Sequence, residues 1–403
     1  MMDMKKICLL SALLLLGLPA VAQESISVDE VLVPKGHQGL IPVKFHFNEG
    51  HEYVSYQFKV NLPEGISYVK DEYGKSTIFL GDGQPAALYT LDLSQYVTCY
   101  SNPSTIIGGN DGVLVYIPVE VSDELTVGSE LTASLTDIAF GSIDAVSHSF
   151  PNSSFTIKIT DEIILDENSP VAPQNAANVK VRVKRTIKAN QWSTLCLPFD
   201  MTVAQLKAVF GADVELAEFS DYETVTDGSD VTSLTVNFDD ADLTDGFYGN
   251  WPYLIKTSKD ITEFTIDGVS IVNDVASAVA EYDNGKSGKQ RKVFGKFIGT
   301  YEAGTIVPDE SLFLSDNKFW YSVGNTKIKA FRAYFTFNDV LSSLNGSNVK
   351  MFFGDAETRV NDINGDEDES VYDLGGRKLA DSKADAHIRR GVYIVNGQKV
   401  VVK

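Results

Sequence analysis

Short runs in which apolar and polar residues alternate recur along most of the chain, and they constrain the fold more than any other feature. The run 41–47 places Val43, Phe45 and Phe47 on one face, and the run 56–60 repeats the pattern. Clusters of Gly, Asn and Asp separate such runs. A period of two residues with turn residues between the runs is typical of antiparallel sheets. We therefore expect an all-β protein.

The length of the chain indicates more than one domain. Its 403 residues exceed what a single core of ordinary size accommodates. Two stretches of polar and acidic residues interrupt the alternation. We expect two β-sandwich-like domains and a small β-hairpin tail, with these bounds: a β-sandwich at 23–162, a linker at 163–178, a second β-rich domain at 179–355, an acidic linker at 356–370 and the tail at 371–403.

The second domain is expected to contain one short helix. Thr202 is a suitable N-cap, and Gln205 three residues later completes a capping box. Apolar residues between 203 and 210 fall on one helical face, and Gly211 is positioned to end the helix.

The first 22 residues have the pattern of an export signal. Lys5 and Lys6 precede an apolar run over 7–18, and small residues occupy 20–22. We expect residues 1–22 to be a signal peptide that is removed on export. After it, no apolar run approaches the ~20 residues that span a bilayer, so no transmembrane span is expected in the exported chain.

The charge of the chain excludes one class of partner. The net charge is −21. The leader contributes +1 through two lysines and one aspartate, so the exported chain carries −22. A strongly negative surface repels phosphate backbones, and we expect no nucleic-acid partner.

Two cysteines, Cys99 and Cys196, remain after the leader. They fall in different expected domains, and the sequence does not bring their Cα atoms within bonding range. We favour buried free thiols over a disulfide. Whether they stay reduced is left open.

Several segments of the first domain carry a family resemblance. They are the opening strand, the turn at 36–42, the strand at 54–63 and the strand that begins Asp111-Gly112-Val113-Leu114. Together they resemble a cohesin-type sandwich, a family grouped with secreted carbohydrate-binding and scaffold modules. Where that family often has Tyr-Asp-Pro, this chain has Asn61-Leu62-Pro63.

The C-terminal residues read as two hairpins. Gly375-Gly376 and Asn396-Gly397 each supply the two positive-φ residues of a tight hairpin turn. Tyr372–Lys378, Gly391–Val395 and the terminal Lys403 resemble the sorting domain of the type IX secretion system. That resemblance implies delivery to the outer surface of a Gram-negative bacterium, followed by removal or anchoring of the tail. An ordinary pair of terminal hairpins is the alternative.

An acidic stretch offers one candidate metal site. Its spacing matches positions 1, 3, 5, 7 and 12 of a calcium loop, with these ligands: Asp362, Asn364, Asp366, Asp368 and Asp373. Glu367 stands where such a loop needs Gly, and flanking helices are missing. We favour an acidic linker, with Ca²⁺ as the alternative, and expect no other cofactor.

Aromatic residues are the candidate binding groups. Trp251, Tyr253, Trp320 and Tyr321 could present flat faces for stacking sugars. The alternative is core packing, the more common role of such rings. Exposure of the rings separates the two interpretations.

No catalytic motif is present. The sequence has no Gly-x-Ser-x-Gly elbow, phosphate loop or dinucleotide fingerprint, and His46 and His51 do not share a helical face. We expect a non-catalytic cell-surface protein, secreted or held at the outer surface, that binds glycan or protein through its sandwich modules. The alternatives are a structural or fimbria-like subunit and a secreted polysaccharide-active enzyme. Ligand identity and oligomeric state are left open.

Overall fold

A computed structural model describes residues 23–81, 89–92, 96–101, 105–227, 230–244, 246–274, 279–283, 294–337, 349–353, 371–372, 378–380, 391–395 and 398–402. The chain divides into two compact units, Met1–Ile163 and Ile164–Lys403. Strands dominate both units, and the described residues contain one α-helix. The predicted all-β fold with one short helix is therefore confirmed.

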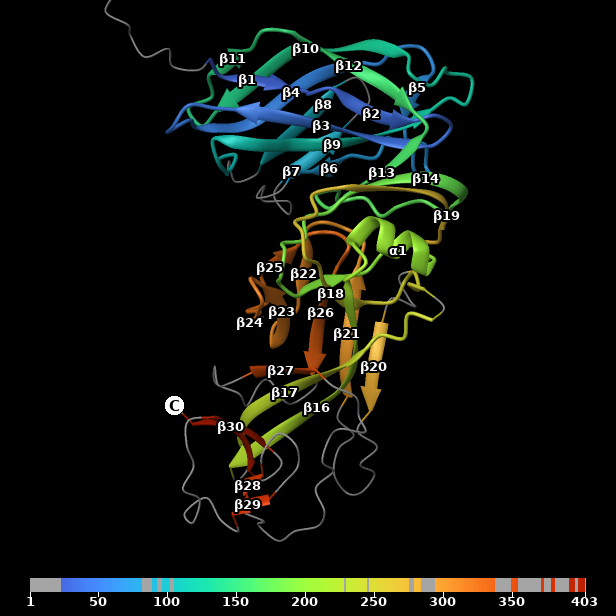
Figure 1. Cartoon of the computed structure of the whole chain (residues 1–403). Coiled ribbons are helices and arrows are strands. Elements are labelled where there is room, and N and C mark those ends of the chain that lie inside the picture. Colours follow the sequence, from blue (N-terminus) through green and yellow to red (C-terminus); the bar gives the residue numbers. More distant parts are fainter. Residues whose placement is uncertain are drawn as a thin grey trace, which may run out of the picture. The chain divides into compact units, whose positions relative to one another are not determined.

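The first unit is a sandwich of two sheets (Figure 1). The β3 sheet contains, in spatial order, β1 (Ser25–Ser27), β3 (Gln38–His46), β9 (Asp111–Val121) and β5 (Ile66–Tyr68), with β6 (Phe79–Leu80) also paired to β9. The β10 sheet contains β2 (Val31–Pro34), β12 (Ser153–Thr160), β10 (Glu130–Ser142), β4 (Tyr53–Asn61), β8 (Val97–Ser101) and β7 (Tyr89–Asp92), with β11 (Ser147–Ser149) paired to β10. β2 and β12 pair in parallel, and the other printed pairings in these sheets are antiparallel.

One core fills the space between the two sheets. It consists of the inward residues of the alternating runs, among them Val43 and Phe45 of β3 and Leu135 and Phe140 of β10. A side chain on every second residue reaches the core, so the outward residues are free to be polar. The alternation in the sequence thus sets which side of each strand is buried.

A bulge interrupts the alternation in β10. The register shifts between Thr136 and Ala139, and Asp137 takes a positive φ of 53°. Because of this extra residue, Leu135 and Ile138 both reach the core although they are three positions apart.

The second unit contains two five-stranded sheets and smaller ones. The β16 sheet contains β15 (Ser193–Leu195), β18 (Tyr253–Lys256), β16 (Glu215–Asp227), β17 (Asp230–Asp240) and β27 (Val349–Phe353). The β26 sheet contains β20 (Val279–Asp283), β21 (Phe294–Thr300), β26 (Arg332–Phe337), β23 (Ser311–Ser315) and β24 (Lys318–Tyr321). The smaller sheets are β13 (Glu162–Asp166) with β14 (Ala176–Lys184) and β19 (Phe264–Ile271), and β22 (Thr305–Val307) with β25 (Thr326–Ile328).

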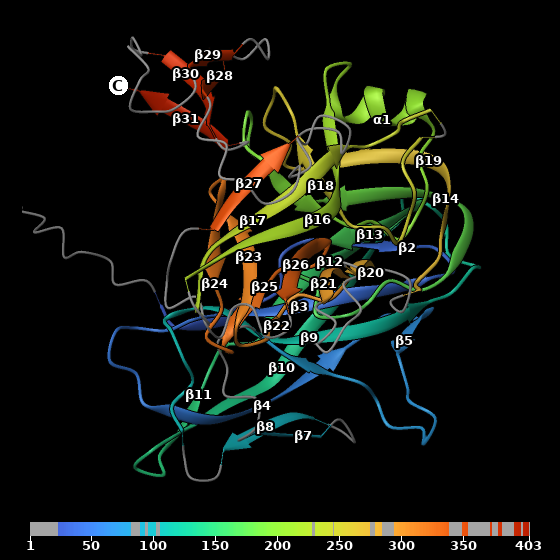
Figure 2. The same ribbon diagram turned by 90° about the horizontal axis from the view of Figure 1, so that it is seen from below.

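Aromatic rings join the β16 and β26 sheets. Phe297 of β21 stacks on Phe335 of β26 with ring centroids 4.1 Å apart and planes 1° from parallel. Phe238 of β17 meets Phe335 edge-on at 5.8 Å, so the two sheets share one core. Figure 2 shows β16 and β17 side by side as a long hairpin, with β27 next to β17.

The predicted helix is α1 (Val203–Phe210). The hydroxyl of Thr202 accepts a hydrogen bond from the Gln205 N–H at 3.2 Å, and the Gln205 side chain accepts one from the Thr202 N–H at 2.9 Å. Gly211 ends the helix with a φ of 105°. The capping box therefore forms as expected.

The segment 163–178, expected to be a linker, contains most of β13 and a buried carboxylate. Glu167 accepts hydrogen bonds from Arg332 Nη2 at 2.9 Å and Lys329 Nζ at 3.1 Å. Its Oε2 lies 3.4 Å from Nη1 of Arg185, the largest fully buried side chain in the described residues. The sequence hides this role because the two arginines and the lysine stand 18 to 165 residues away.

Arg185 donates further bonds to the backbone. Its Nη2 donates to the Thr194 carbonyl at 2.8 Å, and its Nη1 donates to the Thr186 carbonyl. The guanidinium thus contacts both Thr194 of β15 and Glu167, which follows β13. Glu167 in turn binds Arg332 of β26. A segment held by buried ionic hydrogen bonds is part of the second unit rather than a free linker.

The tail forms one four-stranded sheet in the order β29 (Lys378–Ala380), β28 (Val371–Tyr372), β30 (Gly391–Val395) and β31 (Gln398–Val402). The expected partners pair antiparallel, β28 with β29 and β30 with β31. The predicted turn residues Gly375-Gly376 and Asn396-Gly397 lie outside the described residues.

Candidate functional site

The outward side of the β10 sheet in the first unit is covered by small polar side chains. They alternate along their strands with core residues, which turns them away from the sandwich interior. We call this surface the hydroxyl face, and it comprises Ser55, Gln57 and Asn61 of β4, Thr98 of β8, Thr132, Ser134 and Thr136 of β10, and Ser154 and Thr156 of β12.

Strand register arranges the hydroxyl face in rows. Ser134 stands opposite Ser154 on one side and Asn61 on the other, and Gln57 stands opposite Thr98. The Asn61 amide donates to Ser134 Oγ at 3.1 Å and to Thr136 Oγ1 at 3.0 Å. These bonds fix the orientation of the central side chains.

Two lysine–carboxylate pairs accompany this face. Lys59 Nζ lies 3.3 Å from Asp137 Oδ2, and Lys158 Nζ lies 3.7 Å from Glu130 Oε1. Hydrogen bonds to Tyr96 and Asp137 raise the pKa of Lys59, so its charge persists at neutral pH. Each carboxylate is matched by a cation, and this surface therefore does not share the strong negative charge of the whole chain.

Among the Phe, Tyr and Trp side chains of this sheet that the structure describes, Tyr100 is the exposed one. It stands opposite Ser55 in the β4–β8 register, and 52% of its surface is exposed. An exposed tyrosine beside small hydroxyls is the combination that antibody paratopes use, with the ring as an anchor and the hydroxyls as adaptable donors and acceptors.

The sequence interpretation did not single out the hydroxyl face. The signal was present in Thr132-Ala-Ser134-Leu-Thr136, where hydroxyls alternate with core residues. Alternation alone indicates a solvated strand face. Only the register shows that hydroxyls from four strands adjoin one another.

The four predicted aromatic binding residues do not form one surface. Tyr253 is 1% exposed, and its buried hydroxyl accepts a bond from the Tyr248 N–H at 3.4 Å. Trp251 and Tyr321 are partly buried against the core of the second unit. Trp320 is 51% exposed and is the only one of the four that is mostly open to solvent.

The predicted calcium ligands Asp362, Asn364, Asp366, Asp368 and Asp373 lie outside the described residues. Within the described ranges, no three His, Cys, Asp or Glu side chains lie close enough to share a metal ion. Likewise, no described helix has the length and hydropathy to cross a membrane.

Ser142, Asp144 and His148 bring together the residue types of a hydrolase triad. Ser142 Oγ lies 3.3 Å from His148 Nε2, but it also bonds to Asp144 Oδ1 and to the Val146 carbonyl at 3.0 Å. The last two groups only accept, so the single hydroxyl proton goes to one of them and not to His148 Nε2. A serine whose proton is directed at another acceptor is not oriented for deprotonation by the imidazole.

Glu218 and Asp239 are a second arrangement of catalytic residue types. They stand opposite each other on β16 and β17, and burial raises the pKa of Glu218. Both alternate with core residues of the same sheet, so they project side by side. Glycosidase carboxylates instead flank a substrate bond from two sides.

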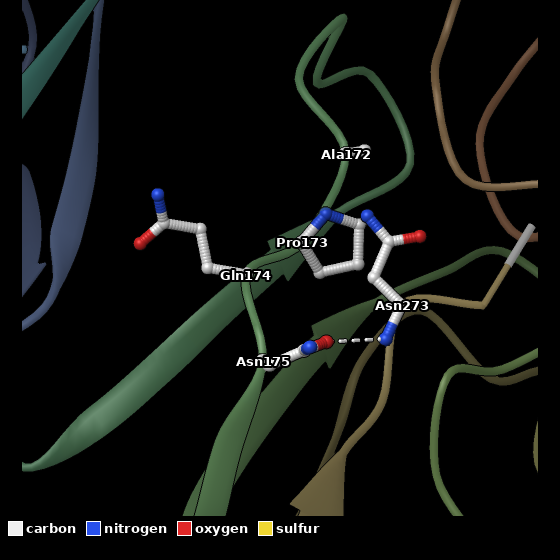
Figure 3. Close-up of a pocket in the computed structure, with 5 residues that line it drawn as sticks. All are labelled: Ala172, Pro173, Gln174, Asn175 and Asn273. Atoms are coloured by element: carbon white, nitrogen blue, oxygen red, sulfur yellow. Dashed lines mark hydrogen bonds between the residues drawn. The ribbon is translucent and has the colours of Figure 1, made fainter.

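A shallow depression of about 450 Å³ lies beside the start of β14 (Figure 3). Its lining consists of Ala172, Pro173, Gln174, Asn175 and Asn273, and the Asn175 side chain accepts a bond from the Asn273 N–H at 2.7 Å. The lining contains no titratable side chain, so it offers polar contacts without acid–base chemistry.

No protein-family model matches this chain, and no curated protein is similar to it. Solved cohesin structures are similar over about a third of it. The sixth cohesin of scaffoldin B from Acetivibrio cellulolyticus, solved with a Cel5 dockerin, matches 34% of this chain and 98% of its own at 14% identity and a TM-score of 0.29.

Two further cohesins show the same extent of similarity. A non-cellulosomal cohesin from Archaeoglobus fulgidus matches 34% of this chain and 92% of its own, at 20% identity and a TM-score of 0.27. A cohesin module of a family 33 glycoside hydrolase from Clostridium perfringens matches 34% and 96%, at 16% identity and a TM-score of 0.27. Such values are too low to transfer a partner to this chain.

Proposed function

We propose that this chain is a non-catalytic cell-surface protein whose first unit binds a protein partner on the hydroxyl face. The observation that carries the proposal is the composition of that face, where hydroxyl and amide side chains from four strands adjoin one another and an exposed Tyr100 stands opposite Ser55. Such a surface offers many adaptable hydrogen bonds at small cost in side-chain entropy.

The packing beneath the face supports this role. Each face residue is held by core neighbours on its own strand, including Leu135 and Phe58, which are fully buried. A rigid sheet presents its polar groups already in position, which lowers the entropy lost on binding. The resemblance of the first domain to cohesin-type modules agrees with a binding role.

The location proposed for this protein rests on its two ends. Residues 1–22 would direct export, and the tail would direct delivery to the outer surface of a Gram-negative bacterium. The tail sheet is compatible with a separate sorting module.

The test uses the chain from residue 23 to 403 on beads, exposed to solubilised surface proteins of the source bacterium. A face variant, Ser134→Arg with Gln57→Arg, is compared with a control variant, Ser27→Arg with Ser67→Arg, at two exposed positions on the β3 sheet, the other sheet of the sandwich. We expect mass spectrometry to find a protein retained by the parent and the control but lost with the face variant. Tyr100→Ala should weaken its binding about tenfold.

Three results would contradict the proposal. One is retention that the face variant leaves unchanged. Another is hydrolysis of a polysaccharide by the purified chain, which would favour the enzyme alternative. The third is concentration-dependent self-assembly in size-exclusion chromatography without any retained partner, which would favour a structural subunit.

A further inference from the structure

Four side chains lie in one row across the outward side of the β26 sheet. Trp320 of β24 stands opposite Phe313 of β23, Phe313 stands opposite Tyr334 of β26, and Tyr334 stands opposite Ile298 of β21. Their neighbours along the strands belong to the core of the second unit, namely Phe319, Leu312, Phe335 and Phe297. The row therefore points away from that core. We call Trp320, Phe313 and Tyr334 the aromatic row.

The exposed end of the aromatic row is held rigidly. The Trp320 indole N–H donates to the Ser315 carbonyl at 3.1 Å. The turn between β23 and β24 has positive φ at Asp316 and Asn317, the geometry of a tight hairpin. The Asn317 side chain in turn accepts a bond from the Trp192 N–H at 3.0 Å. The ring is thus fixed before any ligand arrives.

Along the strands, the aromatic row is covered by another strand at one end and bordered by exposed polar residues at the other. The Ser322 hydroxyl is buried and donates to the Val307 carbonyl at 2.7 Å, so β22 covers this end of the face. Thr336, opposite Ser311 at this covered end, is half-buried, whereas Ser315 and Lys318 at the other end are exposed. Trp320 is exposed while Phe313 and Tyr334 are half-buried, and the open end of the row is bordered by groups that can bond to hydroxyls.

We propose that the aromatic row binds a glycan chain by stacking. Adjacent strands are ~4.8 Å apart, so three rings in register form a straight track across the strands. Pyranose rings have flat C–H faces that pack on aromatic rings and rims of hydroxyls that need polar neighbours. This inference rests on the proposed function in one respect, that the chain binds without transforming its ligand.

The test is native electrophoresis of the chain from residue 23 to 403 in gels containing a soluble β-glucan, a xylan or a mannan. We expect at least one polysaccharide to retard the parent. Trp320→Ala should weaken that retardation about tenfold, and Trp320→Phe should restore much of it. Tyr248→Ala, which removes a half-exposed tyrosine elsewhere in the second unit, is the matched control and should not change it.

The remaining outcomes overturn the inference. They are absence of retardation of the parent in all three gels, and equal retardation of the parent and Trp320→Ala. If Trp320→Ala fails to fold, Tyr334→Leu decides, because it keeps apolar volume while removing a ring. The bead experiment, which tests the hydroxyl face of the first unit, is independent of the gels. If the parent retains a protein on the beads but is not retarded by any polysaccharide, this inference alone is refuted. Release of sugar fragments in the gels refutes the proposed function as well.

Discussion

The Arg185 guanidinium lies 3.4 Å from the Glu167 carboxylate, and both side chains are shut away from solvent, at 0% and 5% exposure. Burial, followed by the nearby charge of Arg332, lowers the pKa of Arg185 to about 9, which leaves it cationic at neutral pH. One carboxylate thus faces three cations, since Lys329 also donates to it. Losing that carboxylate would leave buried positive charge uncompensated.

Glu167→Gln is therefore expected to destabilise the second unit by ~3–5 kcal/mol, the usual cost of breaking a buried ion pair. All three tryptophans of the chain lie in this unit, so urea unfolding followed by tryptophan fluorescence reports on it alone. Asp166→Asn is the control. It removes the neighbouring Asp166–Lys184 pair, which is partly exposed at 3.8 Å, and should cost under ~1 kcal/mol. Similar losses for the two variants would contradict the buried role of Glu167.

The Glu167 carboxylate should also make the folding stability of the second unit depend on pH. Burial alone would raise the pKa of Glu167, but the charges of Arg185 and Arg332, with a hydrogen bond from Lys329, outweigh burial and hold it below its ordinary value. The stabilisation is fully present above the unfolded pKa of ~4.3 and is lost as pH falls through the lower folded value. The stability difference between parent and Glu167→Gln should be constant above about pH 5 and shrink below about pH 4. A difference that grows on acidification would show that the pKa is raised instead.

Thr202→Ala is expected to cost ~1 kcal/mol by removing the N-cap of α1. The Thr202 hydroxyl accepts a hydrogen bond from the Gln205 N–H, and the Thr202 N–H donates one to the Gln205 side chain. Thr202→Ser keeps the hydroxyl and should retain most of the stability. Urea unfolding with tryptophan fluorescence measures both variants, and an equal loss for Ser and Ala would mean that the cap does not stabilise the unit.

Both cysteines are expected to resist alkylation in the native protein. Cys99 and Cys196 are fully buried and unpaired, and burial raises the pKa of each thiol to about 12. A protonated, inaccessible thiol reacts poorly because the thiolate is the nucleophile. Mass spectrometry after iodoacetamide treatment should show labels only when urea is present. Rapid labelling of the folded chain would contradict this burial.

The fold was largely predictable because its strands are local patterns. The alternation over 41–47 and the capping box at Thr202 each require only neighbouring residues, and both appear as expected. The bulge at Asp137 was not predictable, since it depends on the register of β10 against β4. The burial of Glu167 among cations could not be predicted for a similar reason, because its partners are distant in sequence.

The candidate surfaces were less accessible to sequence reasoning. Trp251-Pro252-Tyr253 and Trp320-Tyr321 look alike as exposed aromatic pairs, yet Tyr253 is buried and Trp320 is not. The residues that extend Trp320 into a row, Phe313 and Tyr334, come from other strands and are joined to it by pairing. Cross-strand neighbours of this kind follow from the register, which local composition does not contain.

The alternation of core and outward side chains along β10 has a consequence for how this protein can evolve. Apart from the bulge, the side chains of this strand alternate between the sandwich core and the outward face, where they contact only neighbouring strands. Exchanging Thr132 or Ser134 for another small polar residue would alter the proposed binding surface with little penalty to folding. Such a scaffold can acquire new ligands through stepwise surface replacement while its interior stays constant.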